Sequence, residues 1–105
     1  MTRVKFFADG DCILGFSVSG HSSNNCEDIN GKIVCSAVSS AVYMAANTLT
    51  EIIGQDCDIQ LDDALFTLRT SNCSESAKAV LEGLKLHLTE LSKQYPKRIK
   101  IITEV

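Results

Sequence analysis

Two segments of the chain repeat apolar residues at every third or fourth position, and shorter strand-like stretches surround them. This spacing predicts helices with one buried face, whereas strict alternation predicts strands. The first helix is expected from Ile33 to Ile53 and stops at Gly54, and the second begins after the N-cap candidate Ser74 and closes at Tyr95. The expected buried positions are Val34, Val38, Ala41, Val42, Ala45, Leu49, Ile52 and Ile53 in the first helix, and Ala77, Val80, Leu81, Leu84, Leu88 and Leu91 in the second.

The strand-like stretches predict two hairpins and a C-terminal strand. Residues 3 to 7 and 12 to 19 lie on either side of an Asp-Gly turn signal, which indicates the first hairpin. Alternating runs at 57 to 61 and 65 to 69 indicate the second, and residues 98 to 105 alternate as a final strand. The order ββαββαβ favours an α/β (α+β) fold with one mixed sheet and helices packed against it.

Composition indicates one compact domain over residues 1–105, because 105 residues with 45% hydrophobic content suit a single core. Ten basic against 13 acidic side chains give a net charge of -3, so neither direct nucleic-acid binding nor membrane binding is expected. The N-terminus turns acidic too early for a signal peptide, which favours a cytoplasmic protein. Five cysteines without CxxC spacing predict reduced thiols, and Cys12, Cys57 and Cys73 are expected to be structural.

A histidine and a cysteine flank the most polar stretch of the sequence. Residues 20 to 32 are rich in Ser, Asn and Gly, which predicts an exposed, mobile loop between His21 and Cys35. Cys35 is expected in the first turn of the first helix, where the helix dipole favours a thiolate by about 0.3 to 1 kcal/mol. Because this contribution alone is small, activation would require the imidazole of His21, and the two side chains would then form a nucleophile and its base.

Two other interpretations use the same residues. A cysteine near a helix start is often only a small buried group, and a histidine after a strand is often a surface residue. A zinc site from Cys12, His21, Cys26 and Cys35 lacks the short ligand pairs of structural zinc, so no metal or other cofactor is expected. The acidic residues between positions 56 and 63 are expected to face water.

The pattern as a whole resembles the ribosomal-processing cysteine protease family, Prp. The resemblance rests on Gly20-His21, the polar loop, and the stretch IVCSAVS at 33–39 that opens a long helix, followed by hairpin, helix and strand. It implies a cytoplasmic, homodimeric endopeptidase that removes the N-terminal extension of large-subunit ribosomal protein number twenty-seven during ribosome assembly. It also implies that Cys35 attacks the scissile carbonyl and His21 transfers the proton.

Gly20 and Ser39 are the expected supporting residues of this site. Gly20 permits a sharp turn beside the base, and Ser39 lies one helical turn beyond Cys35. One departure from the family is Lys32, which stands where relatives typically have Asp, so Asp28 or Glu27 would have to take over any orienting role. This departure keeps a second function open, a non-catalytic ribosome-assembly binding module of the same fold.

Overall fold

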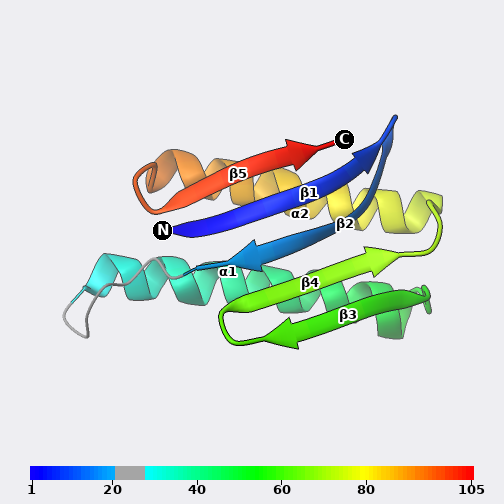
Figure 1. Cartoon of the computed structure of the whole chain (residues 1–105), viewed down its shortest axis with the longest axis horizontal. Helices are drawn as coiled ribbons and strands as arrows, with labels where there is room; N and C mark the ends of the chain where they lie inside the picture. Colours follow the sequence, from blue (N-terminus) through cyan, green and yellow to red (C-terminus); the bar gives the residue numbers. More distant parts are fainter. Residues whose placement is uncertain (21–27) are drawn as a thin grey trace.

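The structure is a computed structural model that describes residues 1–20 and 28–105. Its elements follow the expected order ββαββαβ, with a π-helical turn, η1, continuing the first helix (Figure 1). Each predicted strand is present within one or two residues of its expected ends. The elements are β1 (Thr2–Asp9), β2 (Cys12–Ser19), α1 (Ile29–Asn47), η1 (Thr48–Ile52), β3 (Cys57–Asp62), β4 (Leu65–Thr70), α2 (Glu75–Gln94) and β5 (Ile99–Glu104).

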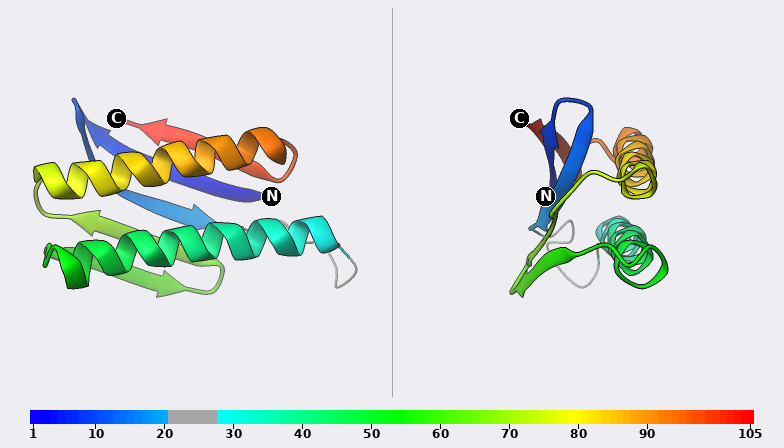
Figure 2. Two further views of the ribbon diagram at one scale, coloured as in Figure 1. Left: turned by 180° about the vertical axis from the view of Figure 1, so that it is seen from behind. Right: turned by 90° about the vertical axis from the view of Figure 1, so that its right-hand side faces the viewer.

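All five strands form one sheet in the order β3-β4-β2-β1-β5. The pairs β1–β2, β2–β4 and β3–β4 are antiparallel, whereas β1 and β5 are parallel, so the predicted mixed sheet is confirmed. Both helices cover the same face of this sheet (Figure 2). The other face is left without a covering layer of helices, and β3 and β5 are the two edges.

The core lies between the sheet and the two helices. Strand residues that face the helices alternate along the chain, as the period of a strand requires, and the helices contribute residues from one stripe each. Ile52 was expected in this stripe but is 80% exposed, because η1 widens the helix and turns Ile52 off the buried face. The largest fully buried side chains are Phe6, Phe16, Leu49, Leu68, Leu81, Leu88, Val4 and Val34.

Helix α1 begins at Ile29, four residues before its expected start at Ile33. Asp28 is the N-cap, and its Oδ1 accepts a hydrogen bond from the backbone N–H of Gly31 at 3.1 Å. Its second carboxylate oxygen forms a salt bridge with Arg98, at the start of β5. The prediction that residues 28–32 belong to an exposed loop is therefore wrong, because a cap and an ion pair to a distant segment fix them as the first helical turn.

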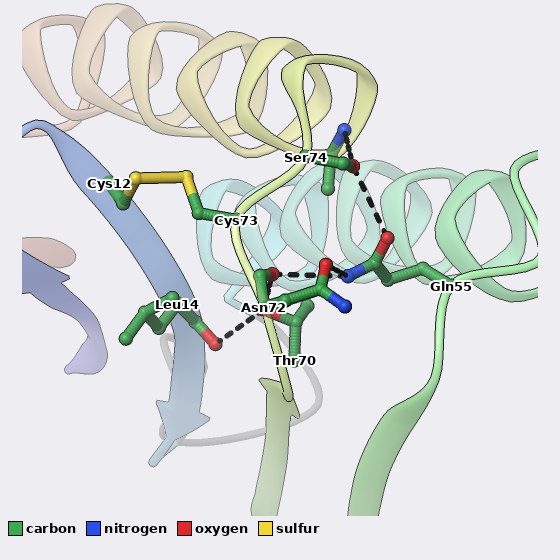
Figure 3. The surroundings of a disulfide bond; sticks show 8 residues. Cys12, Leu14, Gln55, Thr70, Asn72, Cys73 and Ser74 are labelled. Carbon is green, nitrogen blue, oxygen red and sulfur yellow. Dashed lines mark hydrogen bonds between the residues drawn. A yellow bond between two sulfur atoms is a disulfide. The ribbon is translucent and has the colours of Figure 1, made fainter.

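A disulfide links Cys12, the first residue of β2, to Cys73, just before α2 (Figure 3). The prediction that these thiols are reduced is thus wrong for this pair, since the fold brings two residues 61 positions apart to a Cα–Cα distance of 6.0 Å. The neighbouring loop is also held by hydrogen bonds, in which Thr70 Oγ1 donates to the Leu14 carbonyl at 3.3 Å and Gln55 Nε2 donates to Asn72 Oδ1 at 2.7 Å.

The segment Ile29–Ile52, which comprises α1 and η1, is long and apolar enough by composition to cross a membrane. In this fold its buried stripe packs on the sheet and includes Val34, Val38 and Leu49, which are 2% exposed or less. The core helix of a globular fold can be as long and as apolar as this segment. We therefore describe the segment as the core helix of the fold.

Candidate active site

Cys35 lies on the flank of α1 that faces away from α2 and lines a cavity of about 210 Å³. The cavity is bordered by the end of β2 and by the β3–β4 hairpin, which contributes Leu61 and Phe66. Two of the expected supporting residues, Gly20 and Ser39, line the same cavity. His21, the expected base, and Cys26 lie outside the described residues.

Gly20 fixes the direction of the chain at the residue before His21. Its φ of +83° is in a region that favours glycine, and a Cβ atom there would lie 2.4 Å from the carbonyl oxygen of Met1. Its N–H also donates a hydrogen bond to the carbonyl of Ala64, in the β3–β4 turn, at 3.2 Å. Gly20 therefore has a backbone conformation that a sharp turn can use, and its hydrogen bond ties the end of β2 to the hairpin beside the cavity.

The early start of α1 changes the electrostatics predicted for Cys35. Cys35 is the seventh residue of the helix rather than part of its first turn. Because the dipole effect is confined to the terminal turn, the predicted stabilisation of a thiolate by this helix end is lost. Any activation of Cys35 must therefore come from side chains, and His21 is the candidate that the sequence offers.

Asp28 and Lys32 precede Cys35 at the start of α1, Asp28 as the N-cap and Lys32 in the first turn. The Asp28 side chain is 14% exposed and holds both the Gly31 N–H and Arg98, so this carboxylate fixes the helix start. Lys32 is exposed, as expected for a surface residue, and does not line the cavity of Cys35. Glu27, the other expected substitute for the missing acid, lies outside the described residues.

A second small cavity continues along the same flank of α1. It has a volume of about 70 Å³ and shares Val38 and Ser39 with the cavity of Cys35. Tyr43, one turn beyond Ser39, meets Phe66 edge-on with ring centroids 6.1 Å apart. Neither ring was predicted as part of the site. The sequence did offer a signal for Tyr43, because Cys35, Ser39 and Tyr43 follow one another at intervals of four residues and therefore lie on one flank of the helix.

No group of three or more His, Cys, Asp or Glu within residues 1–20 and 28–105 is arranged to hold a metal ion. Cys12, one of the four residues of the zinc interpretation, cannot bind zinc as a thiolate because it forms a disulfide with Cys73. The described part of the site therefore combines the Cys35 thiol, the hydroxyls of Thr2 and Ser39 and the carboxylate of Asp62 with apolar walls.

Cys57 provides an internal reference for thiol chemistry. Burial, and then the negative charge of Asp56, raise the pKa of the Cys57 thiol above its ordinary value. We expect iodoacetamide to modify Cys57 slowly at neutral pH and faster only as the pH rises above the range of an ordinary thiol. Mass spectrometry of digested samples labelled at a series of pH values measures this profile, and rapid labelling of Cys57 at pH 7 would contradict it.

The sequence model of the family described as Cysteine protease Prp matches residues 1–100. Among solved structures, an essential ribosomal processing protease Prp from S. aureus, in complex with a covalently linked product peptide, matches with a TM-score of 0.89. The two are 18% identical, and the match covers 99% of this chain and 100% of that one. SMU.848 from Streptococcus mutans matches with a TM-score of 0.85 and 23% identity, over 99% of both chains. Comparison with curated protein sequences gave no match.

Proposed function

The chain belongs to the cysteine protease Prp family, as the sequence predicted, and we propose that it is a cysteine endopeptidase with Cys35 as nucleophile and His21 as base. The observation that carries this proposal is the position of the Cys35 thiol. It lines an open cavity whose wall includes Gly20, the residue directly before His21. Thiol catalysis requires a base within reach of the nucleophile, and the residue that follows Gly20 in the sequence is a histidine.

In the proposed reaction the Cys35 sulfur attacks the scissile carbonyl carbon, and His21 accepts the thiol proton. The tetrahedral intermediate collapses, the C–N bond breaks, and His21 returns the proton to the leaving amine. Water then hydrolyses the thioester, restoring the thiol and releasing the new carboxylate. Gly20 holds the turn before the base, and the Ser39 hydroxyl supports the site from one helical turn beyond Cys35.

For the substrate we propose the N-terminal extension of large-subunit ribosomal protein number twenty-seven. The S. aureus protein of the same family has crystal structures with a substrate peptide and with a covalently linked product peptide. The net charge of -3 suits a basic ribosomal protein as partner. We further propose that residues 1–105 act as one cytoplasmic domain without a cofactor, and that the active form is a homodimer.

A second candidate function is a non-catalytic binding module on the assembling ribosome. Two observations favour it. Lys32 stands where the family resemblance leads us to expect an acid, and Cys35 lies too far along α1 to gain from the helix dipole.

Incubation with the extended ribosomal protein from the same genome distinguishes the two functions. The peptidase is expected to produce one shortened protein whose mass corresponds to loss of the N-terminal extension, whereas a substrate that already lacks the extension stays intact. Stable binding of the extended protein without any change in its mass would reject the peptidase and support the binding module.

A further inference from the structure

We propose that the free edge of β3 is the substrate-docking strip, on which an extended peptide of alternating apolar and basic residues pairs as a sixth strand. The strip comprises residues 57–62. This inference rests on the proposed peptidase function, and it adds where the substrate lies and which sequence pattern the protein selects.

The edge strand β3 is open for pairing. Among residues 1–20 and 28–105 it pairs only with β4, so alternate residues direct their backbone N–H and C=O groups away from the sheet. Five of its six residues are exposed, and its apolar residues Ile59 and Leu61 are 43% and 70% exposed. Natural edge strands are usually protected by lysine, proline or a bulge, and β3 contains neither lysine nor proline. The opposite edge strand, β5, carries Lys100.

This strip leads directly to the candidate nucleophile. Leu61 and Asp62, the last two residues of β3, line the same cavity as Cys35. The cavity continues to the rings of Tyr43 and Phe66, and Phe66 is the cross-strand partner of Leu61. A peptide paired with β3 therefore reaches the thiol at one end of the strand, while its side chains on the helix side meet apolar walls. Addition of a strand to a sheet edge gives affinity through the main chain and specificity through every second side chain.

The side chains of the strip specify the chemistry of this partner. Leu61 faces the helix layer, and because strand side chains alternate, Ile59 faces the same way and Asp58 faces the uncovered side of the sheet. The strand and its turn carry Asp58, Asp62 and Asp63, all exposed, and no basic residue. Apolar peptide side chains thus pack beside Ile59 and Leu61, whereas basic ones lie beside the carboxylates.

Binding can be measured without cleavage in the full-length Cys35→Ser variant. The probe is a short capped peptide of alternating leucine and lysine, with a block-sequence peptide of the same composition and a leucine–glutamate peptide for comparison. We expect the leucine–lysine peptide to bind at least about tenfold more tightly than either. In amide hydrogen exchange it should protect residues 57–62 and leave 99–104 unchanged. Equal binding of the three peptides, or protection of β5 instead, would overturn the proposal.

Backbone pairing is tested by methylating the peptide nitrogens of alternate residues. One methylated set removes the N–H groups that face β3 and is expected to weaken binding about tenfold or more, whereas the other set points outward and binds almost normally. Asp58→Lys should weaken binding, and the matched charge reversal Glu104→Lys on β5 should not. Binding that is indifferent to both methylation patterns would refute strand addition.

Different results would reject the peptidase function and the docking strip. Loss of the peptidase activity leaves the binding assay interpretable, because that assay uses a variant without the Cys35 thiol. Conversely, cleavage of the extended ribosomal protein at normal rates by Asp58→Lys would preserve the peptidase and reject the docking strip. Protection of residues 57–62 that grows with protein concentration in the absence of peptide would assign the edge to a second copy of the chain and would also reject the strip.

Discussion

The Cys35→Ala variant is expected to cleave the extended ribosomal protein about 10⁴-fold more slowly than the parent, or not measurably. The substitution removes the Cys35 sulfur, the one sulfur among the described residues that line the cavity at the end of β2, and without it no covalent intermediate can form. The side chain is half-buried and small, so alanine leaves the packing of α1 almost unchanged. Progress curves recorded by mass spectrometry measure the effect.

Ser36→Ala is the matched control, because Ser36 is the neighbour of Cys35 on α1 but is exposed and does not line the cavity of Cys35. This variant should cleave at close to the parent rate. His21→Ala should lose cleavage to a similar extent as Cys35→Ala, since a nucleophile and its base act as a unit. Substantial cleavage by Cys35→Ala, with its fold verified by circular dichroism, would rule out Cys35 as the nucleophile.

The double variant Cys12→Ser/Cys73→Ser is expected to lose about 4 kcal/mol of unfolding free energy. The disulfide closes a loop across 61 positions, and constraining a loop of this length in the unfolded chain contributes on that order. For a chain of 105 residues this corresponds to a fall in Tm of roughly 15 to 30 °C. Urea unfolding followed by circular dichroism measures the free energy, and thermal unfolding measures the Tm.

The parent protein treated with dithiothreitol is the natural control and should match the double variant. If the reduced parent and the variant both unfold at the same urea concentration as the untreated parent, the disulfide has no stabilising role. Trapping thiols in a fresh lysate tests the proposed cytoplasmic location at the same time, because that compartment keeps most thiols reduced. A Cys12–Cys73 pair found reduced in the lysate would agree with the cytoplasmic location, whereas a pair found oxidised would argue against it.

The order of the helices and strands was predictable, because apolar residues recur clearly at every second position in the strands and at every third or fourth position in the helices. The start of α1 was not. Asn30 and Gly31 are typical of turns, and the contacts that make them helical involve the cap Asp28 and its ion pair with Arg98, 70 positions away. Local preference was thus overruled by a tertiary contact that no window of sequence contains.

The candidate site was predictable in part. Cys35, Ser39 and Gly20 were named from the sequence, and the fold brings all three to one cavity. The disulfide was missed because spacing reveals cysteine pairs only when they are close in sequence, and Cys12 and Cys73 meet only once β2 pairs with β4. The apolar walls were missed for the same reason, since hairpin and helix contribute them from separate parts of the chain.

The proposed mechanism requires a Cys35 thiolate, and thiolates attack disulfides and exchange partners with them. The length of β2 separates the two groups. Cys12 begins the strand and the cavity of Cys35 adjoins its other end, roughly 24 Å away at 3.4 Å per residue. The other thiol of the described chain, Cys57, lies toward the disulfide end, and there burial favours the protonated, unreactive form. The fold therefore places the disulfide and Cys35, the proposed nucleophile, near opposite ends of β2.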